Sequence, residues 1–541
     1  MYIKTNKIRG EITRLISRCL FIASALAAFS MPVAHAQDSG IYVQCPETTV
    51  HHPLQNAAAG PDDNGISVRG SSADGSAIKC DHITAGDGMS TMADNAATRQ
   101  YIFGFARISL PDAAVDAAGV AVAAEDYPSW TMDQGTLAAN TPAPTIVLDE
   151  DDEYYLNLTN TGMIMRPDLF DPHSIHWHGF PQAASVFDGV PDSSISVNMG
   201  ATLAYYYKAK DAGTYMYHCH VEATEHMQMG MLGNLFVHPR QNRCDAIQEQ
   251  NDTILPAELV TLNDQHTALD AEFTQLNTDL LALQNEAVPD QEAIDAKQAE
   301  VDAKQAEVDD KQIEVDAKQA EIEALAAYIA VNPGTSCPDD GEHAVGDKYA
   351  YNDGDGSTRY DVEVPIQLGS FDPEFHNASF NTQPLPFADM RDRFFLLNGR
   401  GYPDTSVETI AATVDPLGRA QDSQPVSSLI QATSGQKILL RISNLNVTDV
   451  YTVGVNGLPM EVVALDSRLL RDDDGNNMYY KTNSLTIGGG QSVDAIIDTT
   501  GLAVDSKFLF YIKNLDKLAN DAENMGGMMT EIQITPAVPA I

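Results

Sequence analysis

The chain has 541 residues and a formal net charge of −44 at pH 7, with 43% hydrophobic and 20% charged residues. A chain of this length is expected to fold as two or three domains. Its strong acidity argues against nucleic acid and anionic lipid as partners. No long apolar stretch follows the N-terminal region, so we expect no membrane insertion of the mature protein.

Residues 1–36 have the composition of a secretory signal peptide. Basic residues precede an apolar run from Cys19 to Ala34, and a small-residue cleavage pattern ends at Ala36. We therefore expect an exported protein, periplasmic or extracellular. Residues 37–98 are rich in Gly, Ala, Ser and Asp without clear periodicity, which predicts an irregular N-terminal extension.

Two later regions have the pattern of β-sandwiches. Residues 99–242 contain short β-branched and aromatic runs, such as "GNLFVH" at 233–238, separated by Gly, Pro and Asp turns. This pattern is typical of an antiparallel β-sandwich. Because it returns from about Tyr349, residues 341–541 are predicted to form a second β-sandwich.

Between them, residues 243–340 predict a helical insertion. The first half has leucine at every seventh position from 262 to 283, as a coiled-coil seam requires. After Pro289, near-copies of "VDAKQAE" keep Ile or Val in register. We expect two long antiparallel helices, with surface ion pairs four residues apart, such as Glu300 with Lys304.

The cysteines predict two disulfides and one free thiolate. Of six cysteines, one lies in the signal segment, which leaves an odd number in an oxidising compartment. Cys219 lies within "HCHVEATEHMQMGM", among histidines and methionines, so we expect it to stay unpaired. The simplest pairing of the others is Cys45 with Cys80, and Cys244 with Cys337 at the base of the hairpin.

The stretch at 218–231 predicts a copper site. Copper that cycles between Cu(I) and Cu(II) favours one thiolate, two imidazoles and a weak thioether. Cys219, His226 and Met231 supply thiolate, one imidazole and thioether, and "DPHSIHWHGF" at 171–180 supplies the other imidazole. Zinc gains nothing from a methionine, so we predict copper.

Paired histidines predict a second site beside the first. On a strand, His176 and His178 point to one face. His218 and His220 flank Cys219 in the same way, while Cys219 points to the other face. The paired histidines therefore favour a second copper joined to the first by the His-Cys-His backbone.

At these residues the chain resembles the multicopper oxidase family. "HWHGF" is similar to the family's His-x-His-Gly motif, and "YHCHVEATEHMQMGM" to its His-Cys-His…His…Met signature. The resemblance implies a mainly β chain, with two cupredoxin-like Greek-key β-sandwiches and an inserted α-helical coiled-coil hairpin. It implies that His173, Cys219, His226 and Met231 bind the type 1 copper, and that His176, His178, His218 and His220 bind the second site.

The chain also departs from the family. Multicopper oxidases build a trinuclear oxygen-reducing cluster from four His-x-His pairs, whereas this chain has two. The gap from Cys219 to His226 is seven residues rather than the usual five. We therefore do not expect a complete trinuclear cluster within one subunit.

The implied function is that of a copper-dependent oxidoreductase. It would take electrons from a small reductant, a phenol or a low-valent metal ion, and pass them to a second copper site that reduces oxygen. Nearby carboxylates are candidates for handling protons or cations: Glu222, Glu225 and Asp188.

Three alternatives remain open at this point. In copper nitrite reductases, which the chain also resembles, a type 2 copper is shared across a trimer interface. His178 and His218 match two of its ligands and His376 of a neighbour would be the third, which implies a homotrimer or another homo-oligomer, although His176 replaces an expected aspartate. Alternatively, the protein is a non-enzymatic type 1 copper electron-transfer protein, or the hairpin is an assembly arm on an inert sandwich.

Overall fold

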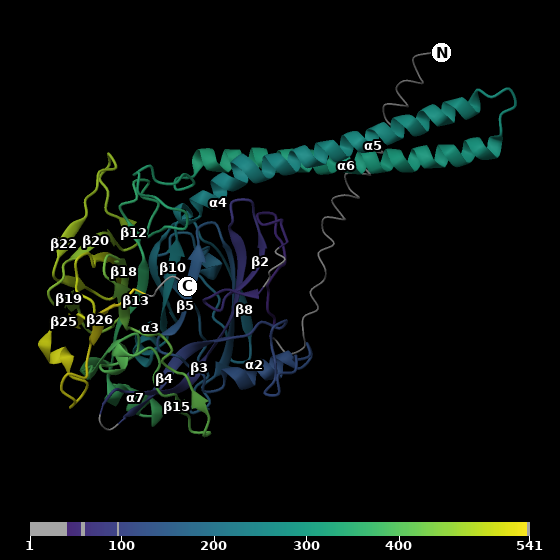
Figure 1. Cartoon of the computed structure of the whole chain (residues 1–541). Helices are drawn as coiled ribbons and strands as arrows, with labels where there is room; N and C mark the ends of the chain where they lie inside the picture. Colours follow the sequence, from purple (N-terminus) through teal and green to yellow (C-terminus); the bar gives the residue numbers. More distant parts are fainter. Residues whose placement is uncertain (1–40, 56–59, 95–96, 538–541) are drawn as a thin grey trace, which may run out of the picture. The chain divides into compact units, whose positions relative to one another are not determined.

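The computed structural model describes residues 41–55, 60–94 and 97–537. The predicted signal peptide lies outside these described residues. From Val43 onward the chain forms one unit, which is built of two β-sandwiches and a long helical hairpin (Figure 1). This arrangement confirms the predicted fold class.

The first sandwich consists of two sheets. Its strands are β1 Gly60–Pro61, β2 Ser67–Ser71, β3 Ala77–Thr91, β4 Arg99–Ile108, β5 Ala143–Asp149, β6 Glu153–Gly162, β7 His176–His178, β8 Thr202–Lys208, β9 Gly213–His218 and β10 Leu232–His238. One sheet has the order β1-β2-β3-β6-β8, with β4 paired to β3, and the other has the order β5-β10-β9-β7. Trp177, Tyr205 and Leu235 are among the fully buried side chains of its core.

Strand β3 corrects one prediction, because residues 77–91 belong to the sandwich rather than to an irregular extension. This 15-residue strand pairs with β2, β4 and β6, and its first twelve residues are all buried. Both of its faces are covered, so the sequence shows no alternation of polar and apolar residues. Small residues are required where neighbours approach closely: a Cβ on Gly88 would lie 3.0 Å from the Cβ of Ala139.

The second sandwich follows the hairpin. Its strands are β11 Lys348–Tyr349, β12 Arg359–Tyr360, β13 Val362–Phe371, β14 Phe394–Leu397, β15 Thr413–Val414, β16 Ala420–Gln421, β17 Ile430–Thr433, β18 Lys437–Asn444, β19 Tyr451–Val455, β20 Met460–Leu465, β21 Arg468–Leu469, β22 Tyr480–Thr482, β23 Leu485–Ile487, β24 Gln491–Asp498, β25 Lys507–Ile512 and β26 Met529–Thr535. The two main sheets have the orders β14-β13-β18-β24-β20-β21, with β22 on β20, and β17-β26-β25-β19-β23. Ile442, Tyr451 and Phe510 are buried between these sheets.

The hairpin consists of α5 Leu255–Gln284 and α6 Gln291–Val331, which pack side by side (Figure 1). Val301, Val308 and Val315 are buried at heptad spacing, which confirms the helical hairpin. The ion pairs differ from those expected, because Lys304 binds Glu307 (2.7 Å) on its own helix and Glu272 (3.0 Å) on the other, rather than Glu300. The remaining α-helices of the described residues are α2 Tyr127–Gly135, α3 Ala223–Met229, α4 Cys244–Glu249 and α7 Pro373–Phe380.

Both predicted disulfides are present. Cys45 is bonded to Cys80 and Cys244 to Cys337, while Cys219 is free and buried. The second disulfide cross-links the two ends of the hairpin insertion. Among the described residues, no helix is both long enough and apolar enough to cross a membrane.

Candidate metal centre

Two short strands of the first sandwich bring the histidine motifs together. β7 lies antiparallel to β9, so that His176 is opposite His218. Between the two β7 histidines, Trp177 points into the core and is 1% exposed, whereas His176 and His178 are half-buried on the other face. The alternation expected of a strand therefore holds at this position.

The first ligand group lies inside the sandwich. The ligand atoms of His173, Cys219 and His226 all lie within 4.8 Å of one another. The Nδ1 atoms of His173 and His226 lie 3.8 and 3.2 Å from the Cys219 Sγ, and the Ser174 N–H faces the same sulfur at 3.5 Å. One thiolate and two imidazoles, all fully buried, are the donor set that fits a copper able to change oxidation state.

A helix explains the long gap between Cys219 and His226. The chain turns at Glu222, which has a φ of +47°, and enters α3, which ends at Gly230 with a φ of +115°. This helix returns His226 to the sulfur and then leads into β10. Met231 follows directly, fully buried in the same core, and its carbonyl accepts a hydrogen bond from the Cys219 N–H at 3.2 Å.

The charges in this group favour a bound cation. Burial lowers the pKa of His173 well below its usual value, so its imidazole is neutral. Burial also lowers the pKa of His226, but the Cys219 thiolate and Asp171 outweigh this effect and raise it to about 10. Without a metal, His226 is therefore protonated at neutral pH, and a metal cation that binds its imidazole would displace that proton.

Three carboxylates surround the outer edge of His226. Asp171 Oδ2 lies 3.5 Å from His226 Nε2, and Glu222 belongs to the same close group. Burial raises the pKa of Glu225 to about 7, and the charges of Asp171 and Glu222 contribute in the same direction. Glu222 and Glu225 thus lie beside the first ligand group as expected, whereas Asp171 was missed, although it precedes His173 by only two residues.

The second ligand group lies at the surface of the sandwich. Ligand atoms of His176, His178 and His218 lie within 4.8 Å of one another. The Nδ1 of His176 lies 2.7 Å from the Asp188 carbonyl, and the Nδ1 of His218 lies 2.8 Å from the Cys219 carbonyl. Because a carbonyl only accepts hydrogen bonds, both Nδ1 atoms carry hydrogen, which leaves the Nε2 atoms as the metal-binding nitrogens. The Nε2 of His218 faces the His178 Nδ1 at 3.4 Å.

Burial keeps these imidazoles neutral. It lowers the pKa of His218 to about 3 and lowers the pKa of His176 and His178 as well. Neutral imidazoles are the form that binds a metal ion. The Asp188 carboxylate lies 3.6 Å from the His176 Nδ1, so this residue belongs to the second group rather than to the first.

His220 is close to this group but not within it. Its ring centroid lies 5.1 Å from that of His176 and 5.6 Å from that of His218. It lines the same cleft, yet the structure brings only three of the four expected histidines within ligand distance of one another.

The histidines open onto a cleft whose opposite wall comes from the second sandwich. The cleft has a volume of about 590 Å³ and is lined there by residues 445–450 and 489–490. A Cβ on Gly490 would lie 2.8 Å from His178 Nε2, so this turn meets the imidazole with bare backbone. Sequence motifs gave no signal for this wall, because none of its residues is a soft metal ligand.

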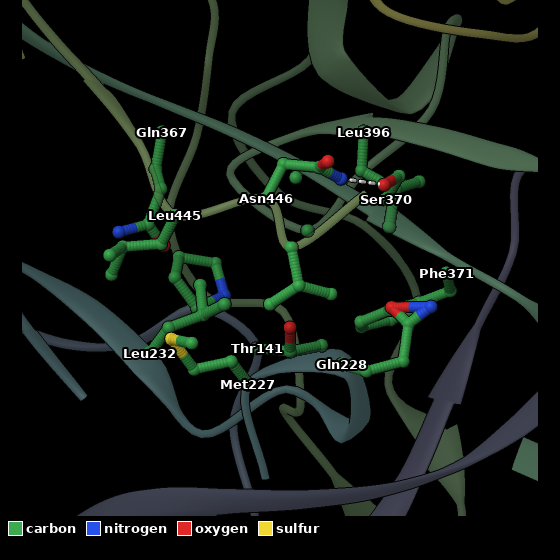
Figure 2. Close-up of a pocket in the computed structure, with 14 residues that line it drawn as sticks. Thr141, Met227, Gln228, Leu232, Gln367, Ser370, Phe371, Leu396, Leu445 and Asn446 are labelled. Atoms are coloured by element: carbon green, nitrogen blue, oxygen red, sulfur yellow. Dashed lines mark hydrogen bonds between the residues drawn. The ribbon is translucent and has the colours of Figure 1, made fainter. Parts of the chain in front are cut away.

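A much smaller cavity lies between the sandwiches next to this cleft. It has a volume of about 20 Å³ and is lined by Thr141, Gln228, Ser370 and Asn446 among others (Figure 2). Asn446 donates a hydrogen bond to Ser370, and Gln228 donates one to Asp392 at 2.7 Å. A space of this size holds one water at most, so this cavity is too small for a substrate.

The structure does not support His376 as a copper ligand for a neighbouring subunit. It lies on α7 of the second sandwich, fully buried, with Nδ1 2.5 Å from the Tyr101 carbonyl and Nε2 3.0 Å from the Gln228 carbonyl. Both ring nitrogens face carbonyls of the first sandwich, so neither is available to a metal in a neighbouring subunit. His376 instead connects the second sandwich to α3, the helix that carries His226.

Comparisons with known proteins agree with this site. Family models described as multicopper oxidase match residues 127–242 and 375–528. The chain is 34% identical over 103 residues to "Multicopper oxidase MCE" of Talaromyces pinophilus, a match that covers 19% of this chain and 16% of that protein. It is 35% identical over 104 residues to "Laccase abr2" of Aspergillus fumigatus, with 19% and 16% covered. The match thus spans about a sixth of the length of these relatives.

Among solved structures, the blue copper oxidase of Nitrosomonas europaea aligns with a TM-score of 0.45 and 17% identity, over 84% of this chain and 85% of that chain. The copper nitrite reductase of Nitrosomonas europaea aligns with a TM-score of 0.41 and 13% identity, over 84% of this chain and 94% of that chain.

Proposed function

Because the chain belongs to the multicopper oxidase family, we propose that it is a copper-dependent oxidoreductase that takes electrons from a small reductant and reduces oxygen. The carrying observation is that Cys219 of the buried group and His218 of the cleft group are neighbours in the chain. Bound copper supplies reversible one-electron chemistry at both groups.

In this proposal the two groups have different tasks. His173, Cys219 and His226, with Met231 as the weak thioether, hold the type 1 copper. The cleft group holds the second copper, with His220 as an outer member. The ligands of the second copper are His176, His178 and His218, whose ligand atoms lie within 4.8 Å of one another.

The link between the groups is short and rigid. The backbone from Cys219 to His218 is one covalent path, and the hydrogen bond from His218 Nδ1–H to the Cys219 carbonyl is a second path. Both residues are at least nine-tenths buried, so their relative positions are fixed by packing. This geometry supports transfer from a reductant at one group to an acceptor at the other.

The carboxylates favour a low-valent metal ion over a phenol as the reductant. Asp171 faces the His226 Nε2, and Glu222 is exposed beside it. Negative charge at this edge attracts a cation and adds nothing to the binding of a neutral ring.

Two observations favour oxygen over nitrite as the acceptor. This chain has His176, which faces the cleft, where nitrite reductases are expected to carry an aspartate. The histidine that would complete a shared type 2 site, His376, is engaged by two carbonyls in its own chain. The proposed homotrimer consequently has no support from this residue.

Export remains part of the proposal. Two disulfides are consistent with an oxidising compartment, periplasmic or extracellular. Disulfides of this kind are rare in the cytosol of most cells.

Copper counting combined with acceptor assays tests the proposal. We expect at least two coppers per copper-loaded chain, and oxygen uptake driven by ferrous or cuprous ions faster than by a simple phenol. The metal-free protein is the control. One copper per chain with a blue band but no consumption of oxygen or nitrite would instead identify an electron-transfer protein, and consumption of nitrite without oxygen would identify the reductase.

A further inference from the structure

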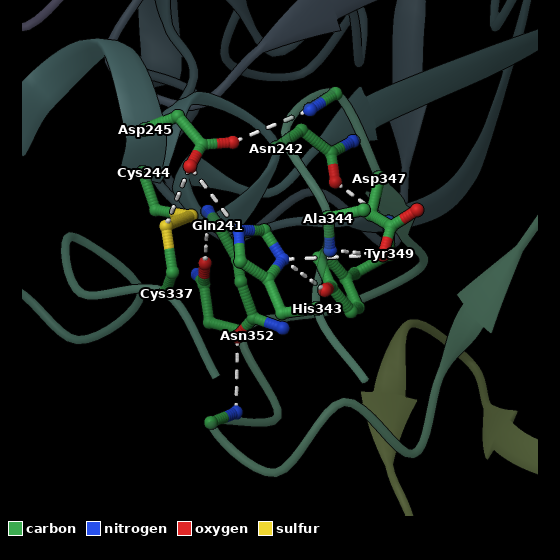
Figure 3. Close-up of a disulfide and its surroundings, with 12 residues drawn as sticks. Gln241, Asn242, Cys244, Asp245, Cys337, His343, Ala344, Asp347, Tyr349 and Asn352 are labelled. Carbon is green, nitrogen blue, oxygen red and sulfur yellow. Dashed lines mark hydrogen bonds and ion pairs between the residues drawn. A yellow bond between two sulfur atoms is a disulfide. The ribbon is translucent and has the colours of Figure 1, made fainter. Parts of the chain in front are cut away.

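A second cluster of metal-ligating side chains lies at the base of the hairpin, separate from the copper groups. Ligand atoms of Cys244, Asp245, Cys337 and His343 all lie within 4.8 Å of one another (Figure 3). Asp245 Oδ1 lies 3.5 Å from the Cys337 sulfur and 3.2 Å from His343 Nε2. In this structure the two cysteines form the disulfide that closes the hairpin.

His343 and Asp245 each use one side-chain atom in a hydrogen bond outside the cluster. His343 Nδ1 lies 2.7 Å from the Tyr349 hydroxyl, and the Gly346 N–H donates to Asp245 Oδ2 at 3.3 Å. These contacts leave His343 Nε2 and Asp245 Oδ1 facing the sulfurs. Outer hydrogen bonds that orient an imidazole and a carboxylate are typical of metal sites.

We propose that reduction of the Cys244–Cys337 disulfide converts this cluster into a zinc site with two thiolates, one imidazole and one carboxylate. A dithiol reductant supplies two electrons and two protons, the sulfur–sulfur bond breaks, and the reductant becomes a disulfide. Zinc then displaces the two thiol protons. The Cα atoms of the two cysteines are 5.1 Å apart, so both thiolates stay near the other two ligands without movement of the backbone.

The donor set favours zinc over copper(I). Zinc accepts sulfur, nitrogen and oxygen ligands in closed tetrahedral sites. Copper(I) prefers thiolate and thioether ligands and gains little from a carboxylate. The four ligands of this cluster leave no open position, which indicates a structural role.

That role is to keep the hairpin closed when the disulfide is lost. The two cysteines are 93 residues apart in the sequence, so a cross-link between them restricts a long loop. The hairpin base also contacts the first sandwich, where the Tyr328 hydroxyl donates to Asp151 at 2.6 Å. Under reducing conditions, a zinc ion bound to this cluster would keep the two ends of the hairpin insertion joined near this contact with the first sandwich.

Cobalt is a suitable probe, because a tetrahedral cobalt–thiolate site absorbs visible light. The full chain carrying Cys219→Ser, which removes the cysteine that is already free before reduction, is reduced with a phosphine and titrated with Co²⁺. We expect one equivalent to bind with thiolate-to-cobalt charge transfer, and zinc to displace it. The oxidised protein of the same variant should show no such band.

Single substitutions assign the band to this cluster. His343→Ala should weaken cobalt binding at least tenfold, and Cys337→Ser should abolish the charge-transfer band. His266→Ala on the hairpin is the matched control and should leave binding unchanged. No band after reduction, or a band of full strength in the Cys337→Ser protein, would overturn the proposal.

Alkylation gives a second measurement that does not depend on colour. In the reduced protein, zinc should slow alkylation of Cys244 and Cys337 at least tenfold, as read by peptide mass spectrometry. Cys45 and Cys80 are the internal control and should react at the same rate with and without zinc. Equal reactivity of all four cysteines in both conditions would contradict the zinc site, even if reduction had loosened the fold.

Discussion

The two sandwiches share one architecture but contribute to the cleft in opposite ways. Each has two packed sheets and each contains parallel pairs, β3 with β6 in the first and β13 with β18 in the second. The first supplies every histidine and the cysteine of the two ligand groups, whereas the second supplies backbone and neutral or acidic side chains. The fold therefore does not determine the metal chemistry; the residues at the strand ends do.

The largest effect is expected from removing the thiolate that only the first sandwich carries. Cys219→Ser deletes the sulfur facing His173 and His226. Because the blue colour of a type 1 copper arises from charge transfer from this sulfur, the visible band and oxygen uptake should both disappear. Absorption spectra and oxygen consumption measure the two losses. A variant that kept its blue band would place the type 1 copper elsewhere.

A change on the cleft face should separate colour from turnover. His176→Ala removes an imidazole of the second group and leaves the buried group intact, because His176 points away from the core. We expect the blue band to persist and turnover to fall at least a hundredfold. His220→Ala is the matched control and should have a smaller effect, because His220 lies outside the close group. Loss of the blue band in the His176→Ala protein would show that its strand face was assigned wrongly.

The contribution of the second sandwich can be tested through its backbone. Gly490 has a φ of +84°, and an added Cβ would lie 2.8 Å from His178 Nε2. Gly490→Ala should therefore displace His178 and also cost about 1–2 kcal/mol of backbone strain. We expect roughly tenfold weaker copper binding in the cleft with an unchanged blue band, measured by metal titration. Gly501→Ala is the control, because Gly501 has a similar φ of +79° with open space around it. Its effect measures the backbone strain alone, without a contact to His178.

The smallest effect concerns Glu225 at the edge of the first group. Burial raises its pKa to about 7 in the folded protein, above the usual value of 4.5, so folding favours the protonated form. The associated stability is present below pH 4.5 and is lost as the pH rises through 7. Glu225→Gln should therefore raise the melting temperature of the metal-free protein at pH 8 and leave it unchanged at pH 4. Equal shifts at both pH values would contradict this assignment.

The parts of the molecule that could be predicted from sequence were those with local repetition or rare chemistry. The two hairpin helices, α5 and α6, could be predicted because their heptad repeats are visible in the local sequence alone. Cys219 and its histidines stand out because soft ligands seldom gather by chance. Once Cys219 was assigned to copper, the disulfides followed as the simplest pairing of the four remaining cysteines.

The missed parts depend on contacts between distant segments. Strand β3 has no alternating pattern, because both of its faces are buried. Asp171 becomes important only after α3 returns His226 to it. The role of His376 depends on two carbonyls of the first sandwich, which no sequence motif indicates.

Because α6 is built of repeated seven-residue units, the length of the hairpin can change by whole units during evolution. An in-frame gain or loss of one seven-residue unit keeps the buried valines in register and changes the helix by roughly 10 Å, at 1.5 Å per residue. A compensating change in α5 would preserve the pairing. Since the cross-link between Cys244 and Cys337 closes the insertion at its base, such changes in hairpin length leave the two ligand groups of the first sandwich where they are.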